Sequence, residues 1–155
     1  KTHKKENVIM NKKQKSLTNK GFSLVELIIV IAIMAVLIGV LAPQYLKYVE
    51  KSRESADLDN YQSIITALQV YASDDTNAAL VGGTIAFTKN GNATVGGDGN
   101  NLTAALSEAS IDITKVKMKS TAYGTATLTV DNSTGTPTFA INVQTLADAL
   151  GITKN

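Results

Sequence analysis

Glu26 is a carboxylate near the start of a long apolar run, and its position makes it the first candidate for a functional group in this chain. Apart from Glu26, nearly all residues from Phe22 to Ala42 are apolar. A carboxylate at the centre of a membrane helix costs about 2.5–3.5 kcal/mol on insertion scales, and less near an end. One explanation is an ordinary membrane anchor in which Glu26 reaches the lipid headgroups. The alternative gives the carboxylate a role of its own.

Other reactive side chains form no recognisable site. The chain has no cysteine and a single histidine, His3, so the usual zinc sites are excluded and the many serines and threonines lack a histidine base. The segments 98–101 and 131–135 offer oxygen ligands, but neither has the spacing of a calcium loop. No strand-to-helix phosphate loop is present. We therefore expect no catalytic residues, no metal and no cofactor, and a protein that is not an enzyme.

The charge distribution points to a membrane. Residues 1–21 carry seven lysines and one glutamate, a net charge of +6, whereas residues 22–155 carry a net charge of −4. A basic block directly before an apolar run is typical of a cytoplasmic flank. A nucleic-acid-binding tail explains it less well, because no linker separates the two segments.

The apolar run is long enough to cross a bilayer as a helix. The twenty-one residues from Phe22 to Ala42 span about 30 Å at 1.5 Å per residue. A secretory signal peptide has a shorter apolar region of about 7–15 residues. The segment VLAPQY that ends the run is also a poor cleavage site for a signal peptidase. A plain anchor explains the length but not Glu26.

The segment around this carboxylate, KGFSLVELIIVIAIMAVLIGVLAPQY, resembles the N-terminal signature of type IV prepilins and related pilin-like proteins. That signature is a short basic leader, a glycine, a phenylalanine, and a glutamate as the fifth residue of the mature chain. Lys20, Gly21, Phe22 and Glu26 match it in order. The resemblance covers residues 10–75, and its first thirty residues are highly specific.

The resemblance implies processing and a role for the carboxylate. A membrane prepilin peptidase would cleave between Gly21 and Phe22 and methylate the new amine of Phe22. That amine, with an ordinary pKa of about 7.7–8.0, would be mostly charged at neutral pH. An unpaired Glu26 among packed apolar helices would be unfavourable, so we predict that it pairs with the Phe22 amine of a neighbouring subunit and sets the axial register.

The resemblance also implies partners and location. The partners are other copies of the chain in a helical filament, the prepilin peptidase, the pilus assembly platform in the inner or cytoplasmic membrane, and membrane lipid before assembly. Nucleic acid is expected only for a DNA-uptake pilin. The protein is expected in the cytoplasmic membrane before assembly and in a cell-surface pilus afterwards.

Gly39 and Pro43 interrupt the predicted helix. A proline inside a helix removes one hydrogen bond and kinks the axis. A simple kink is one interpretation. By resemblance to pilins, we favour a segment that bends in the monomer and unwinds locally in the filament.

An amphipathic helix should continue beyond Pro43 to about Ser73. Its apolar stripe follows helical spacing: Tyr61, Ile64, Ile65, Leu68, Tyr71 and Ala72. Its polar side, which includes Glu50, Arg53, Glu54 and Asp57, is interpreted as a solvated face. Arg53 and Asp57 are spaced to attract, and Glu50 and Glu54 to repel.

Residues 76–155 predict a small head. Asn90-Gly91 is a turn signal between short strands. The alternating segments 123–130 and 138–143 predict an antiparallel hairpin. Segment 111–118 is a candidate third strand. Two short helices are expected, one over 101–109 capped by Asn100 or Asn101, and one over 145–150 ended by Gly151.

The predicted fold class is α+β and pilin-like, with a protruding hydrophobic helix half and an amphipathic half packed on a small antiparallel sheet. We expect residues 1–21 to be a removed leader, 22–75 the long helix with 22–42 as its transmembrane and assembly segment, and 76–155 the head. The expected function is that of a structural subunit of a type IV pilus used in adhesion or twitching motility. The alternatives are a secretion pseudopilin or DNA-uptake pilin, and a surface protein that stays anchored and never polymerises.

Overall fold

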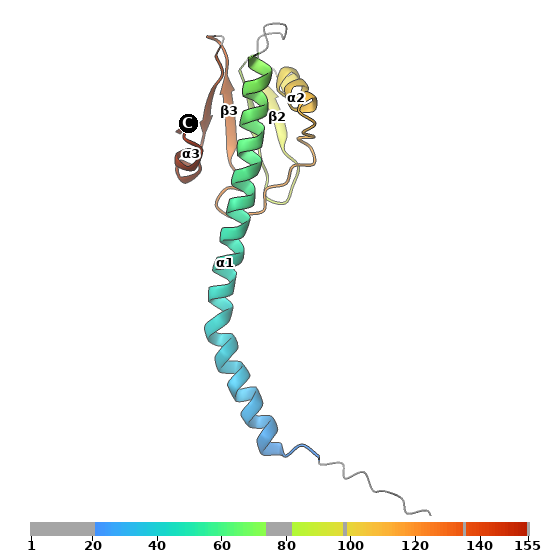
Figure 1. Cartoon of the computed structure of the whole chain (residues 1–155), viewed down its shortest axis with the longest axis vertical. Helices are drawn as coiled ribbons and strands as arrows, with labels where there is room; N and C mark the ends of the chain where they lie inside the picture. Colours follow the sequence, from blue (N-terminus) through green and yellow to red (C-terminus); the bar gives the residue numbers. More distant parts are fainter. Residues whose placement is uncertain (1–20, 74–81, 98, 135, 155) are drawn as a thin grey trace, which may run out of the picture. The chain divides into compact units, whose positions relative to one another are not determined.

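The computed structural model describes residues 21–73, 82–97, 99–134 and 136–154, and it divides into two compact units that meet between Val40 and Leu41. Figure 1 shows the elements in sequence order. They are α1 (Leu24–Ala72), β1 (Gly83–Ala86), β2 (Thr94–Gly97), α2 (Gly99–Glu108), β3 (Thr127–Asp131), β4 (Thr138–Ile141), α3 (Gln144–Leu150) and β5 (Thr153–Lys154). A long N-terminal helix followed by a small sheet confirms the predicted α+β class.

The sheet of the second unit has five strands in the order β2-β1-β3-β4-β5. The first three pairings are antiparallel, but β4 and β5 are parallel, with Ala140 opposite Thr153. The sheet is therefore mixed, and the prediction of a purely antiparallel sheet is wrong. Parallel neighbours need a crossover connection, and α3 supplies it between β4 and β5.

The core of the second unit forms where the apolar stripe of α1 meets one face of the sheet. Tyr61, Ile64 and Leu68 are almost completely buried. They join the inward-facing strand residues in one apolar cluster. The Tyr61 and Phe87 rings meet edge to face at 4.8 Å. The predicted packing of this helix stripe on the sheet is confirmed, and Figure 1 shows this part of α1 lying over one face of the sheet.

Both predicted hairpins are present. β1 pairs with β2, and the intervening turn holds Asn90 at φ 58°, a left-handed conformation that asparagine tolerates well. β3 pairs with β4 in the register Leu128 opposite Ile141. Both of these side chains are fully buried, as the alternation of apolar and polar residues predicts.

Segment 111–118 is not a strand, which corrects one prediction. The Asp112 carboxylate accepts hydrogen bonds from the backbone N–H and the hydroxyl of Thr114, at 3.1 and 2.6 Å. The N–H of Lys115 turns back to the Asp112 carbonyl at 2.9 Å. These local bonds make a turn, and they use backbone groups that a sheet ladder would need.

The two short helices are present, with one cap predicted correctly. Gly151 ends α3 in a left-handed conformation at φ 67°, where glycine is favoured. Asn100 and Asn101 lie inside α2 rather than before it, so the prediction that either caps this helix is wrong.

Candidate functional site

The N-terminal part of α1 presents an unburied apolar surface. All residues from 21 to 40 are exposed, including the large side chains of Leu27, Ile31 and Leu37. The most apolar 18-residue window of α1 has a mean hydropathy of 3.1, so the helix is long and apolar enough to cross a membrane. A surface of this kind requires lipid or other apolar helices around it.

Glu26 takes part in the cap that starts α1. Its carboxylate accepts a hydrogen bond from the backbone N–H of Ser23 at 2.9 Å. The Ser23 hydroxyl in turn accepts one from the backbone N–H of Val25 at 3.3 Å. This reciprocal pattern is a capping box, and a carboxylate in the first turn is also favoured by the helix dipole. The spacing Ser-x-x-Glu at Ser23 and Glu26 is visible in the sequence and is the signal that could have indicated this cap.

The other residues of the predicted processing and assembly site lie close by or further along α1. Gly21 and Phe22 precede the helix, and the Phe22 side chain is 88% exposed. A side chain on Gly21 or on Gly39 would meet no atom within 4 Å. The structure therefore contains no packing reason for glycine at either position. α1 continues without interruption past Gly39 and Pro43, so any unwinding there remains a prediction about the filament.

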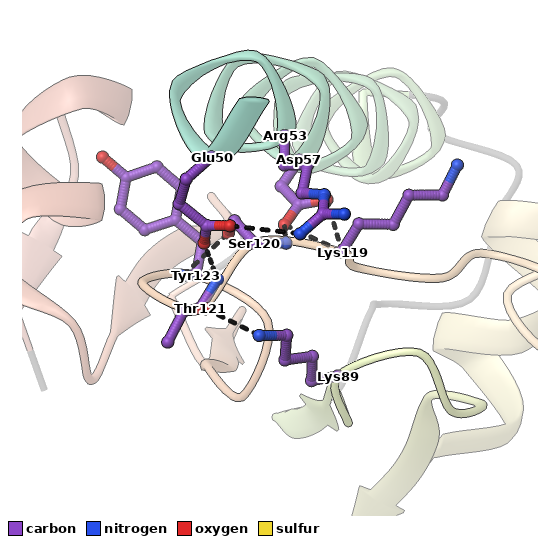
Figure 2. A network of polar contacts seen from close by, with 8 residues as sticks. All are labelled: Glu50, Arg53, Asp57, Lys89, Lys119, Ser120, Thr121 and Tyr123. Atoms are coloured by element: carbon purple, nitrogen blue, oxygen red, sulfur yellow. Dashed lines mark hydrogen bonds and ion pairs between the residues drawn. The ribbon is translucent and has the colours of Figure 1, made fainter. Parts of the chain in front are cut away.

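In the second unit, Asp57 of α1 is the central polar residue at the contact with the head, and sequence reasoning missed it. The residue is 1% exposed. One carboxylate oxygen accepts the backbone N–H of Lys119 at 2.9 Å, and the other accepts those of Lys119 and Ser120 at 3.0 and 2.7 Å. Figure 2 shows Asp57 reaching from α1 to this loop, residues 118–124. Backbone N–H groups rather than a basic side chain thus stabilise the buried charge.

Glu50 makes a second connection between α1 and the same loop. Its carboxylate accepts the backbone N–H of Thr121, and it also pairs with Arg53 at 3.4 Å. The Thr121 hydroxyl accepts a hydrogen bond from the ammonium group of Lys89 at 2.6 Å (Figure 2). Loop 118–124 is therefore held by two carboxylates of α1 and by the β1–β2 turn.

These contacts correct the interpretation of the polar side of α1. Asp57 is buried, and Arg53 pairs with Glu50 rather than with Asp57. Asp57 precedes Tyr61 by four residues, so it extends the apolar stripe by one turn. That position could have indicated burial. Burial, with a contribution from the Asp57 charge, raises the pKa of Tyr61, whose hydroxyl donates to the carbonyl of Tyr123 at 2.9 Å.

Gly124 should be essential to this loop. A side-chain carbon there would lie 2.4 Å from the carbonyl oxygen of Ser120, a backbone atom that cannot move alone. We expect Gly124→Ala to lower the free energy of unfolding by about 1–3 kcal/mol, the usual range for overpacking. Gly82→Ala is the matched control, because its nearest contact would be an ordinary 3.5 Å. Urea unfolding of the full chain in detergent measures both, and equal stabilities would contradict the prediction.

Strong acid should weaken the second unit through two of its carboxylates, Glu50 and Asp112. The Thr121 N–H lowers the pKa of Glu50, and Lys115 lowers the pKa of Asp112 to about 2. A carboxylate whose pKa is lowered by folding stabilises the fold above its ordinary value, near 4, and that contribution is lost as the pH falls toward 2. Asp112 is exposed and Glu50 is only partly buried, so the effect should be small.

The test compares unfolding between pH 5 and pH 2 in two variants. Glu50→Gln should lose less stability with falling pH than the unmodified chain. Glu54→Gln, one turn further along α1, should behave as the unmodified chain, because no hydrogen bond joins Glu54 to the loop in the described residues. Identical pH profiles for all three proteins would contradict the proposed role of Glu50.

Comparison with known proteins connects these features. Residues 17–42 match the family defined by the prokaryotic N-terminal methylation motif. The chain is 34% identical over 56 residues to the type IV major pilin protein PilA of Myxococcus xanthus strain DK1622, which covers 36% of this chain and 26% of that protein. It is 32% identical over 96 residues to the type IV major fimbrial protein FimA of Dichelobacter nodosus, covering 61% and 60% of the two chains.

The extent of these similarities is limited. The matched region spans less than two thirds of the length of either relative, and no solved structure is a significant match. Both relatives are named as pilin or fimbrial proteins and neither as an enzyme, in agreement with the prediction that the chain is not an enzyme. The chain is thus similar to type IV pilins in its N-terminal methylation motif and over the matched part of these two relatives.

Proposed function

We propose that this chain is a structural subunit of a type IV pilus and polymerises through the apolar part of α1. The observation that carries the proposal is the exposed apolar run over residues 22–40 with a single carboxylate, Glu26, in the first turn of α1. Such a surface is covered by lipid in a membrane and by copies of itself in a filament. The names of the two relatives, both major subunits, support the same role.

Processing by a prepilin peptidase is part of the proposal. Cleavage between Gly21 and Phe22 would remove residues 1–21 and leave Phe22 as an N-methylated first residue. The open space around Gly21 supports this, because recognition by an enzyme then explains a glycine that packing does not. The matched methylation motif begins at residue 17 and so includes the cleavage position.

Glu26 would exchange partners during assembly. In the single chain its carboxylate binds the Ser23 N–H, three residues away. In the filament it would pair with the charged Phe22 amine of a neighbouring copy, in surroundings where an unpaired charge is strongly unfavourable. The capping bond keeps the carboxylate at the helix start, next to the place where the incoming amine must bind.

The segment from Gly39 to Pro43 is proposed to unwind in the filament. Pro43 supplies no N–H to the helix, and Gly39 has the weakest helix propensity apart from proline. Closer packing of neighbouring helices can then compensate for the lost hydrogen bonds. A filament map with continuous helical density through 39–43 would overturn this part of the proposal.

The proposed location of the subunit differs before and after assembly. The chain would enter the cytoplasmic membrane through α1, contact the assembly platform there, and leave in a surface filament used for adhesion or motility. The domain limits proposed are 1–21 for the leader, 22–75 for the helix and 76–155 for the head.

Mass spectrometry of filaments sheared from the cell surface tests the proposed function. The expected result is a dominant chain that begins with N-methylated Phe22. The same mature chain found only in membranes would replace the pilus role with that of a secretion or DNA-uptake machine subunit. A chain that keeps Lys20 and Gly21 would overturn the proposal in favour of an ordinary membrane anchor.

A further inference from the structure

A groove of about 1000 Å³ runs between the second half of α1 and the end of α2. Its lining includes the apolar residues Ala67, Val70 and Ile111, and the Val70 side chain is 67% exposed. Two carboxylates, Asp59 and Glu108, line the same groove, and no lysine or arginine among the described residues does. Neither carboxylate has an ion-pair partner among the residues that the structure describes. We call this surface the acidic groove.

A second hollow, lined by lysines, lies next to the acidic groove. Ile111 lines both the groove and this hollow. Lys115, Lys117 and Lys119 are exposed, while the alternate residues Met118 and Ser120 are fully buried. All three lysines line one shallow hollow, so they lie side by side in a row. The backbone N–H groups of Lys119 and Ser120 donate hydrogen bonds to the Asp57 carboxylate, and these bonds hold this row against α1. We call this surface the lysine row.

The two surfaces carry opposite charge and adjoin at Ile111 without sharing a charged residue. Lys115 is paired with Asp112 at 2.8 Å, whereas Lys117 and Lys119 have no ion-pair partner within the described part of the chain. The two unpaired lysines thus equal the two groove carboxylates in number and carry the opposite charge. A patch that complements a different patch on an identical copy makes a heterologous contact, and such contacts that do not close into a ring generate helical filaments.

We infer that the lysine row of one copy docks against the acidic groove of the next copy in the filament, with Lys117 and Lys119 facing Asp59 and Glu108. The inference rests on the proposed function, because it assumes that the chain polymerises. It adds a contact between heads to the assembly segment of α1. Exposed ion pairs are screened by salt, so this contact should be sensitive to ionic strength.

The test is cross-linking in assembled filaments, for which the natural absence of cysteine is an advantage. Full-length Glu108→Cys and Lys117→Cys chains are produced together, and sheared filaments are treated with a short bis-maleimide. This reagent is chosen because ion-paired residues lie further apart than disulfide geometry permits. Cross-linked dimers are expected when both variants are present, and not when either is present alone.

A matched control replaces Lys117→Cys by Lys154→Cys, an exposed lysine on β5 that belongs to neither surface. Filaments that form normally but give no more dimer than this control would overturn the inference while leaving the proposed function intact. Absence of filaments from the unmodified chain would instead remove the proposed function, and the inference with it.

Charge exchange provides a second readout if cysteine variants assemble poorly. Glu108→Lys should reduce the yield of filaments several-fold, and combination with Lys117→Glu should restore it. Equal accumulation of all variants in the membrane shows that the head folds. A double variant with no more filaments than Glu108→Lys alone, at equal membrane levels, would overturn the inference.

Discussion

Replacing Glu26 by glutamine should abolish filaments while leaving the chain in the membrane. Glutamine at this position still accepts the backbone N–H of Ser23, so the helix cap survives and only the charge is lost. Leaving one partner of a buried ion pair alone costs about 3–5 kcal/mol, which weakens subunit addition by on the order of 100-fold or more. Membrane insertion should be unchanged or improved, because a charged side chain opposes it.

Two measurements check this prediction in the same cells: the mass of filaments sheared from the surface, and the amount of chain in the membrane. Ser23→Ala is the matched control, since it removes the bond from Val25 to the Ser23 hydroxyl but keeps the carboxylate. We expect it to assemble. Normal filaments from Glu26→Gln would show that the cap, rather than the charge, is what Glu26 contributes.

The features that the sequence predicted correctly depend on neighbours in the chain. The stripe from Tyr61 to Leu68 follows the helical period, and the alternation around Leu128 and Ile141 follows the strand period. The turn at Asn90 and the stop at Gly151 each follow from backbone conformations that few residues adopt. These local patterns predict the structure correctly because tertiary packing favours the same conformation as the local sequence.

The features that were missed depend on residues far apart in the sequence. Asp57 and its partner Lys119 are separated by 62 positions, and no periodicity connects a carboxylate with backbone N–H groups. The pairing of β5 with β4 was likewise hidden, because two residues, Thr153 and Lys154, are too few to show a pattern. Segment 111–118 alternates like a strand, but tertiary bonds and a turn decide its conformation.

Asp57→Ala should strongly destabilise the packing of the head on α1. The substitution removes three hydrogen bonds to a charged acceptor and leaves the N–H groups of Lys119 and Ser120 without it in a buried site. Bonds to charged groups contribute about 1.5–3 kcal/mol each, and buried donors without partners add a penalty. Because these terms overlap, we expect the free energy of unfolding to fall by about 3–5 kcal/mol.

The measurement is urea unfolding of the full chain in detergent, followed by circular dichroism of the tyrosines, since the chain has no tryptophan. Asp59→Ala is the matched control, because its exposed carboxylate makes no ion pair in the described residues, and a change within about 0.5 kcal/mol is expected. Asp57→Asn should fall between the two, since an amide oxygen can still accept part of the network. If Asp57→Ala were as stable as Asp59→Ala, the carboxylate would not be what holds loop 118–124.

The lysine row that depends on this loop should lose its order in Asp57→Ala, so filament yield should decrease along with head stability.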